Sequence, residues 1–461
     1  MRRRIRANGT WSADSVPRAI RLSVAAVIAL ISAGQAAAQS REQRVREDKR
    51  KIEAEGFWHY NDAAAAFAEA RSSGKPILVV LRCLPCVECV KLDDELIDGD
   101  PRVQPLLGQF VRLRLVSTNG LDLTLFQFDT DQSFAVFFLS PQGDIYGRFG
   151  TRSHTTEWVG DVSIEGLAKA MRGALDLHSE YPGNKSQLSG KRGPAPRYAR
   201  PELFPSLKDK YKSTLNYEGN VVQSCIHCHQ IGDAIRQLAL AGPEKMPEDI
   251  LFPYPHPKSI GLIMDPDEMA TVREVEPDSV AARSGFLPGD AVRSLGGQPL
   301  LSIADMQWVL HQAAPQGAEL PAVITRRGVE MRLTLRLTAG WRRNGDISWR
   351  ASSWELRRAT LGGMVLVPLG DEQKLLRPAD LPEKSMALLV RHVGEYAPHD
   401  LAKRAGVLKG DLLIAFDART DLWTESDVIA YALWEKARGD RVPLKLIRDG
   451  KTISLTLEIS R

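Results

Sequence analysis

The sequence predicts a multidomain chain, with an α/β unit in its first half and two β-rich units in its second half. Helix-like and strand-like patterns alternate over residues 57–178, which is the rhythm of an α/β fold. Prolines are frequent in the next segment, residues 179–257. Farther on, the run Gly-Phe-Leu-Pro-Gly-Asp at 285–290 returns as Gly-Val-Leu-Lys-Gly-Asp at 406–411, so the second half contains an internal repeat.

The amino terminus has the pattern of an export leader. Six arginines precede an apolar run at Leu22–Ala33, and the small residues Ala36, Ala37 and Ala38 follow as a cleavage pattern. We expect residues 1–38 to be a signal peptide and the mature protein to be periplasmic. The apolar run is short for a bilayer span, although an uncleaved leader would act as a membrane anchor.

Charge and size narrow the class of protein. The whole chain has a formal charge of +4, but residues 1–38 hold six arginines and one aspartate, so the remaining chain carries −1. This balance gives no indication of nucleic acid as a partner. A chain of 461 residues with 43% hydrophobic residues has room for about three domains. Residues 39–56 are almost wholly charged, and we expect a solvated helix or a disordered arm that serves as a spacer.

The elements of the α/β unit, residues 57–178, can be placed in order. A helical pattern comes first, and apolar strand patterns and a turn follow. The expected elements are a helix at Asn61–Ser73, strands at Ile77–Leu81, Phe110–Val116 and Phe134–Leu139, a turn at Ser140–Gly143, and a return strand after this turn.

Three cysteines, Cys83, Cys86 and Cys89, come directly after the first apolar strand and before a second helix-like segment. A thiol at the amino terminus of a helix is stabilised as the thiolate, and a second thiol three residues on can form a disulfide with it. With Lys75–Pro76 before it and the Ser140–Gly143 turn after it, this arrangement resembles the thioredoxin-like domains of periplasmic thiol:disulfide interchange proteins. The resemblance implies that Cys86 attacks, Cys89 resolves and Cys83 is an accessory thiol.

Other roles for the cysteine cluster stay open. Closely spaced thiols also bind soft metals such as Cu(I), and buried thiols are often structural. Thioredoxins place a cis-proline opposite the cysteine pair, and the matching stretch Gln132–Val136 contains no proline. Substrate docking by this loop is therefore expected to differ from that of the family.

The proline-rich segment, residues 179–257, contains the run Cys225-Ile-His-Cys228-His229. Two thiols three positions apart can add to the two vinyl groups of a haem, and the adjoining histidine then ligates the iron. We predict a covalently bound haem c on Cys225 and Cys228, with His229 as the proximal ligand. A structural disulfide and a zinc site with ligands from another domain are the alternatives.

The remaining features of the haem segment are less specific. Met246 and His256 are candidates for the sixth iron ligand, although each is more often a surface or packing residue. A helical pattern at Gln230–Leu240 carries Ile231, Ile235 and Leu238 on one face, where they would cover a haem edge. The segment is too short for a compact cytochrome, so we expect neighbouring domains to complete the haem pocket.

Each copy of the repeat is followed by a short strand, a polar turn and a helix, at Ser302–His311 and Thr424–Lys436, and ends in paired strands. This pattern resembles PDZ domains of the bacterial type found in high-temperature-requirement proteases, with units at 258–338 and 361–461 joined by the tryptophan-rich linker 339–360. The resemblance implies capture of an extended peptide from a protein partner. The implied peptide-binding residues are Ile260, Gly261 and Leu262 in the first unit, and Gly363 and Met364 in the second.

These features together predict a periplasmic redox protein that transfers electrons or exchanges disulfides with a recruited protein. The alternative is a non-enzymatic PDZ scaffold or redox sensor in the cell envelope. The sequence has no Gly-x-Ser-x-Gly nucleophile turn, so the PDZ resemblance does not predict a serine protease.

Overall fold

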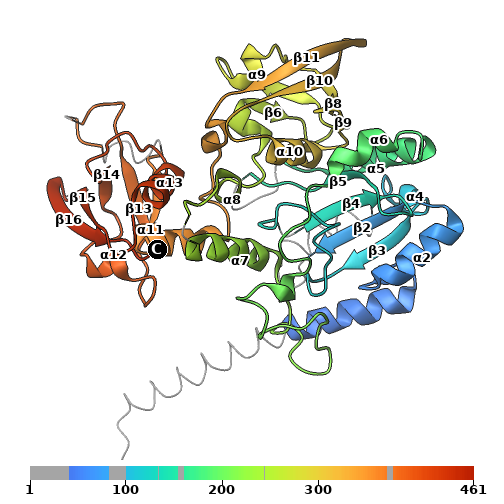
Figure 1. Ribbon diagram of the computed structural model, residues 1–461, viewed down its shortest axis with the longest axis horizontal. Helices are drawn as coiled ribbons and strands as arrows, with labels where there is room; N and C mark the ends of the chain where they lie inside the picture. The colour runs from blue at the N-terminus through green and yellow to red at the C-terminus, as the bar shows by residue number, and fades with distance from the viewer. Residues whose placement is uncertain are drawn as a thin grey trace, which may run out of the picture.

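The computed structural model describes residues 41–82, 100–132, 134–153, 160–242, 244–370, 377–379 and 381–461. The leader and the cysteine cluster Cys83, Cys86 and Cys89 lie outside the described residues. Three units are visible: an N-terminal α/β unit, a middle β-rich unit packed against it, and a C-terminal β-rich unit at the far end of helix α7 (Figure 1). None of the helices in the described ranges is long and apolar enough to cross a membrane.

The N-terminal unit is built on a five-stranded sheet with the order β1-β3-β2-β4-β5. Strands β1, β3 and β2 are parallel, β4 runs antiparallel to β2, and β5 runs antiparallel to β4. Its elements are β1 (His59–Tyr60), α2 (Ala63–Ser73), β2 (Ile77–Arg82), α4 (Gln104–Leu107), β3 (Val111–Leu115), β4 (Phe134–Leu139), β5 (Ile145–Phe149), α5 (Ile164–Ser179) and α6 (Lys185–Leu188).

Both faces of this sheet are covered, because its central strands are apolar throughout. One face of β2, with Val79 and Leu81, packs against α2 and against residues of the proline-rich segment, Ile226 and Cys228 among them. The other face packs against α5. The haem motif is therefore part of the core of the N-terminal unit.

The charged arm is a packed helix over residues 41–55 and not a solvated spacer. Val45 and Ile52 are buried, Val45 against Val116 and Val221. Glu42 caps the backbone near the motif, since its carboxylate accepts hydrogen bonds from the amides of Val221 and Val222 at 3.0 and 2.8 Å. The few apolar residues of the arm form the buried face of this helix, although most of its residues are charged.

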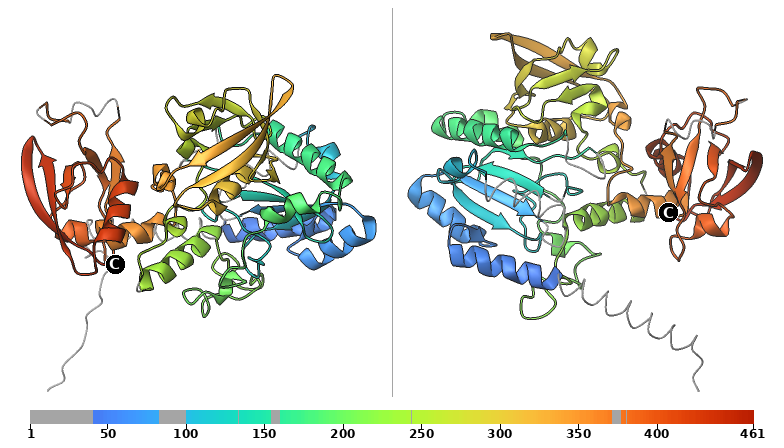
Figure 2. Two further views of the ribbon diagram at one scale, coloured as in Figure 1. Left: turned by 45° about the horizontal axis from the view of Figure 1, so that its top comes forward. Right: turned by 180° about the vertical axis from the view of Figure 1, so that it is seen from behind.

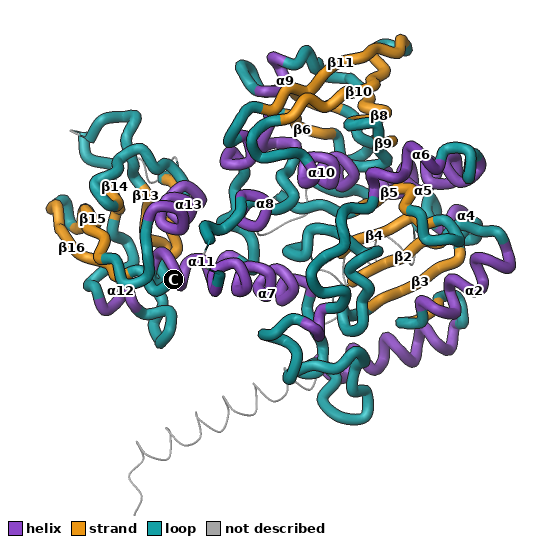
Figure 3. Tube along the Cα trace, viewed as in Figure 1, coloured by secondary structure: helices purple, strands orange, loops and turns teal. Residues whose placement is uncertain are grey.

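The proline-rich segment is mostly loop until it reaches α7 (Figure 3). Its elements are two short 3-10 turns, η1 (Ser189–Lys191) and η2 (Pro201–Leu203), then α7 (Cys228–Ala241) and α8 (Glu248–Leu251). Helix α7 lies between the N-terminal and C-terminal units, as the views of Figures 1 and 2 agree.

The middle unit contains a four-stranded sheet, β11-β10-β8-β9, and a separate β6-β7 pair. Its helix α10 is buried on all sides, because one face packs in the core of the unit and the other contacts β5. The elements are η3 (Pro257–Ile260), β6 (Leu262–Met264), β7 (Val272–Val275), α9 (Val280–Arg283), β8 (Ala291–Leu295), β9 (Gln298–Pro299), α10 (Ile303–Gln312), β10 (Ala318–Arg326) and β11 (Val329–Leu337).

The C-terminal unit is an antiparallel five-stranded sheet in sequential order, β12 to β16. The linker before it forms η4 (Trp341–Asn344) and α11 (Ser353–Leu361). The elements of the unit are β12 (Val365–Pro368), β13 (Leu388–His392), α12 (Leu401–Arg404), β14 (Leu412–Phe416), α13 (Glu425–Glu435), β15 (Arg441–Arg448) and β16 (Lys451–Glu458).

Candidate functional site

The haem motif is fixed to the edge of the N-terminal sheet at which the parallel strands end. Thr118 and Asn119 follow β3, and both bind the backbone of Ile226. The Thr118 hydroxyl donates to the Ile226 carbonyl at 2.8 Å, and the Asn119 amide oxygen accepts from the Ile226 N–H at 2.8 Å. The carboxyl end of β3 lies beside that of β2, where Leu81 pairs with Leu115. The motif is therefore bound at the sheet edge where β2 ends at Arg82, directly before Cys83 in the sequence.

Helix α7 begins within the motif at Cys228. His227 is the N-cap residue, and its backbone N–H donates to the side chain of Gln230 at 2.8 Å, which satisfies one of the donors that a helix start leaves unpaired. Cys228 and Ile231 lie in the core. The cap and the core contact together hold Cys228 and His229 in place at the first turn.

The two motif thiols are buried. Cys225 is 5% exposed and has a free thiol, so no disulfide joins it to Cys228. Burial, with a smaller contribution from Cys228, raises the pKa of Cys225 to about 12, so this thiol is protonated at neutral pH. Within the ranges that the structure describes, no cluster of three or more His, Cys, Asp or Glu side chains is arranged to hold a metal ion.

The motif histidines differ in their surroundings. The Nδ1 atom of His229 lies 3.2 Å from Oδ2 of Asp233, and this hydrogen bond raises the pKa of His229. A histidine that ligates a metal almost always donates its second ring N–H to a carboxylate, a backbone carbonyl or a water. The ring of His227 stacks on that of His229 at 5.8 Å, and burial lowers the pKa of His227.

The motif opens onto a cavity of about 320 Å³. His227, Cys228 and His229 form one wall of this cavity, whereas the linker and the C-terminal unit form another. The latter contribute two indole rings and three guanidinium groups, from Trp349, Trp354, Arg350, Arg357 and Arg391. The cavity is at the lower end of the size range of small-molecule sites.

These residues fit a covalently bound haem. Cys225 and Cys228 supply the two sulfurs, His229 supplies an imidazole whose Nδ1 is already held by Asp233, and the cavity combines aromatic walls with cationic groups. Cys225 does not line the cavity, so its side chain must turn toward it before a second thioether can form.

Neither candidate for the sixth iron ligand lies in the wall of this cavity. Met246 is buried in the core of the C-terminal unit, where its carbonyl accepts from Trp434 at 2.9 Å. His256 lies beside Asp161, with 3.6 Å between Nε2 and Oδ1. The apolar face of α7, with Ile231, Ile235 and Leu238, lines a second and larger cavity of about 1290 Å³.

The structure buries the predicted peptide-binding side chains of the middle unit. Ile260 and Leu262 both lie in its core. Gly261 has a φ of +81°, and a Cβ atom there would lie 2.1 Å from that of Ser279. The glycine is therefore required by the tight turn between η3 and β6, and the side chains beside it face inward.

The corresponding loop of the C-terminal unit is bonded to its own helix. The amide of Gly363 donates to the carbonyl of Arg357 at 3.1 Å, and the amide of Met364 donates to Leu361 at 3.2 Å. Two residues on, the amide of Leu366 donates to Oε1 of Glu425 at 2.8 Å. Three amides at the start of edge strand β12 thus have internal acceptors.

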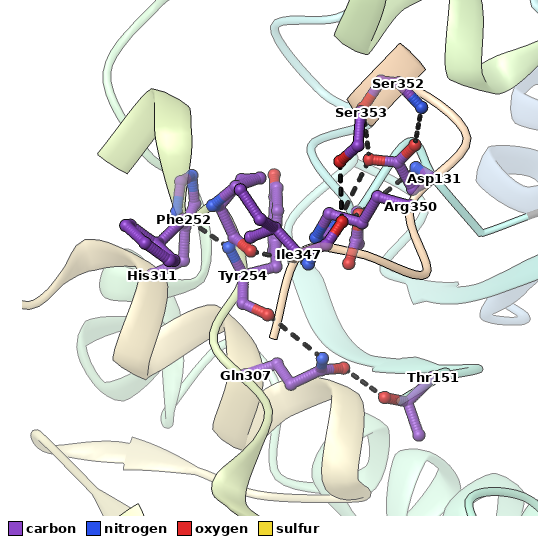
Figure 4. Close-up of polar contacts among 12 residues, drawn as sticks. Asp131, Thr151, Phe252, Tyr254, Gln307, His311, Ile347, Arg350, Ser352 and Ser353 are labelled. Carbon is purple, nitrogen blue, oxygen red and sulfur yellow. Dashed lines mark hydrogen bonds and ion pairs between the residues drawn. The ribbon is translucent and has the colours of Figure 1, made fainter. Parts of the chain in front are cut away.

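A buried ion cluster that the sequence did not reveal joins the linker to the N-terminal unit (Figure 4). Arg350 donates to Asp129 at 2.6 Å and to Asp131 at 3.2 Å, although these residues are 219 or more positions apart in the chain. Ser352 adds two hydrogen bonds to Asp131, at 2.8 Å from its amide and 2.7 Å from its hydroxyl. Asp131 directly precedes the stretch Gln132–Val136, whose last three residues begin β4, so the linker is bonded next to the segment that matches the substrate-docking loop of thioredoxins.

A second set of contacts fixes the middle unit. Gln307 of α10 bonds to the hydroxyl of Thr151 and to the carbonyl of Tyr254, whose ring stacks on His311 at 4.0 Å (Figure 4). The buried Lys191 forms an ion pair with Asp305 at 3.0 Å. These contacts pack the middle unit against the N-terminal unit, and Arg350 and Ser352 of the tryptophan-rich linker pack against the same N-terminal unit.

Two of the three units match known protein families. Residues 58–141 match the thioredoxin-like family, and residues 271–320 match the PDZ domain family. The chain contains a thioredoxin-like domain and a PDZ domain. The first corresponds to the N-terminal unit and the second to the middle unit.

Relatives match only part of the chain. A probable periplasmic serine endoprotease, DegP-like, from Pseudomonas fluorescens is 31% identical over 105 residues, which cover 23% of this chain and 22% of the relative. A protein of the same description from Halomonas elongata is 25% identical over 199 residues, with 43% of this chain and 39% of the relative covered. Among solved structures, the HtrA-type protease AlgW with a decapeptide has 13% identity and a TM-score of 0.20, covering 31% of this chain and 49% of that one. The chain spans less than half the length of these proteins.

Proposed function

We propose that the protein is a periplasmic redox protein that carries a c-type haem on Cys225 and Cys228, with His229 as an axial ligand. The proposal rests mainly on the position of Cys228 and His229 in one wall of the cavity, with the His229 ring oriented by Asp233 at 3.2 Å. When bound, the haem supplies a one-electron couple. Asp233 fixes which ring nitrogen is left for the metal, and the core packing of Cys228 excludes water from that side.

The haem and the cysteine cluster are proposed to act together. Thr118 and Asn119 hold the motif at the sheet edge where β2 ends, and Cys83, Cys86 and Cys89 follow β2 in the sequence. The proposed electron exchange is between the haem and the Cys86–Cys89 dithiol, in two one-electron steps because a dithiol releases two electrons when it forms a disulfide, or between either centre and a recruited protein. Insulin reduction by the full chain should exceed that of the double variant Cys86→Ser/Cys89→Ser, and equal rates would contradict a thiol-exchange enzyme.

We further propose that the C-terminal unit is a second PDZ domain. The two copies of the repeat make matching contacts: Asp290 accepts from the Leu287 amide at 2.9 Å and pairs with Arg326, and Asp411 accepts from the Leu408 amide at 2.8 Å and pairs with Arg448. Peptide capture from a protein partner is proposed for the PDZ pair, by strand addition.

A second candidate function is a non-enzymatic redox sensor or scaffold of the cell envelope. It is favoured by the contacts of Arg350 and Ser352 with Asp131, which tie the loop before β4 to the linker of the C-terminal unit. A protein that binds partners differently in its oxidised and reduced states, yet does not reduce insulin, would fit this candidate.

A further inference from the structure

We infer that Arg391 of the C-terminal unit binds a haem propionate, so that the haem joins this unit to the thioredoxin-like domain. This inference rests on the proposed covalent haem and adds a residue that nothing in the haem motif itself indicates. It starts from the cavity beside His229, which is closed by residues from distant parts of the chain: Trp349 and Trp354 from the linker, and Arg391 from β13.

Arginine is the most frequent residue in the lining of the cavity. Four guanidinium groups line it, from Arg152, Arg350, Arg357 and Arg391. Three carboxylates neutralise two of them: Asp129 and Asp131 bind Arg350, and Glu425 binds Arg357 at 2.6 Å. Arg152 lies 5.7 Å from the ring centre of Trp349.

Arg391 is exposed, and its side chain has no ion pair or hydrogen bond with any residue in the described part of the chain. Its guanidinium is therefore available to an anion that enters the cavity. A haem is apolar across its ring and carries two carboxylates at one edge, and the planar fork of arginine matches a carboxylate with two parallel hydrogen bonds. The indole rings of Trp349 and Trp354 can contact the apolar haem ring, and Arg391 can bind a propionate carboxylate.

Strand pairing connects this contact to the rest of the C-terminal unit. The neighbour of Arg391, His392, pairs with Val365 across β13 and β12, and Val365 also lines the cavity. The ring of His392 packs edge-on against Trp354, with 6.0 Å between ring centres. A bound propionate would therefore hold the beginning of β12, which directly follows Gly363 and Met364, and haem loading would stabilise that edge of the sheet.

The test compares Arg391→Ala and Arg391→Lys with wild-type full-length protein, all matured in a host that attaches c-type haem. Arg441→Ala is the matched control, because Arg441 is an exposed arginine of the same unit, at the start of β15, that does not line the cavity. Each protein is characterised by its pyridine haemochrome, by a spectroelectrochemical titration, and by hydrogen–deuterium exchange of residues 388–392 before and after haem attachment.

We expect all four proteins to retain covalent haem. Removal of the cation should stabilise the ferric state and lower the midpoint potential of Arg391→Ala, with a smaller shift for Arg391→Lys and none for Arg441→Ala. Haem attachment should slow exchange of residues 388–392 in wild type but not in Arg391→Ala. Haem-loaded Arg391→Ala with an unchanged potential and unchanged exchange would overturn this inference alone, whereas colourless wild-type protein would overturn it together with the proposed haem.

Discussion

Replacement of Arg350 by methionine should release the linker from the thioredoxin-like domain. Arg350 is 4% exposed, and Asp129 and Asp131 are 3% and 6% exposed, so the substitution leaves two buried carboxylates without their main cation. Breaking a buried ion pair by removal of one partner costs about 3–5 kcal/mol. Asp131 keeps its two hydrogen bonds from Ser352, which places the expected cost near the lower limit, at about 3 kcal/mol.

Local opening of the linker is the property to measure. A loss of about 3 kcal/mol in the free energy of opening accelerates hydrogen–deuterium exchange by roughly two orders of magnitude. Exchange should become faster in the residues that follow Arg350, up to the first turn of α11, and remain unchanged in distant strands such as β15. The double variant Asp129→Asn/Arg350→Met removes one of the two carboxylate charges that lost Arg350, and it should recover part of the protection.

The pH dependence of this variant has a definite sign. Burial raises the pKa of Asp129 even with Arg350 present. Without Arg350 the ionised form of Asp129 is disfavoured further in the folded state, so stability falls as the pH rises above the ordinary carboxyl pKa of about 3.9. The effect of Arg350→Met should therefore be larger at pH 7.5 than at pH 5. Equal exchange of the linker in the variant and the wild type at both pH values would refute the stabilising role of the contact between Arg350 and the two aspartates.

Three further predictions concern contacts of the middle and C-terminal units. Burial lowers the pKa of His311 to about 3, so below pH 6.5 the unfolded chain binds a proton at this residue that the folded protein does not bind. The free energy of unfolding should therefore fall below pH 6.5 by up to about 1.4 kcal/mol per pH unit. Urea titrations of His311→Gln should not show this slope. Gly147→Ala would place a Cβ 2.6 Å from Leu301 and should cost about 1–3 kcal/mol, whereas an unchanged melting temperature would refute this close contact. Glu425→Ala should accelerate amide exchange at Leu366 more than Glu425→Gln, which retains an acceptor, and equal protection in both would contradict the bond.

Local patterns in the sequence located most of the elements. The predicted strand Phe134–Leu139 has these bounds in the structure, and the helices expected at Ser302–His311 and Thr424–Lys436 lie within one residue of α10 and α13 at each end. These elements are specified by the spacing of their own apolar residues and by caps such as Ser302 and Thr424, which accept hydrogen bonds from the first turns. Residues close in sequence carry such signals.

The composition of the site could be predicted only in part. Cys225, Cys228 and His229 form a contiguous motif, so spacing alone suggested their chemistry. Arg350 and Arg391 belong to the same cavity only because the linker and the C-terminal unit pack there. The spacing of residues in the sequence does not indicate which charged residues come together when domains pack. Met246 illustrates the reverse case, because a flexible thioether near the motif is used to fill the core of another unit.

The most direct test of the account is the pyridine haemochrome spectrum of full-length protein matured in a host that attaches c-type haem, together with its intact mass. The account predicts a coloured protein with one covalently bound haem, and loss of that haem in the double variant Cys225→Ala/Cys228→Ala. Colourless protein of the bare polypeptide mass, or a haem that extracts into acidified acetone, would contradict it.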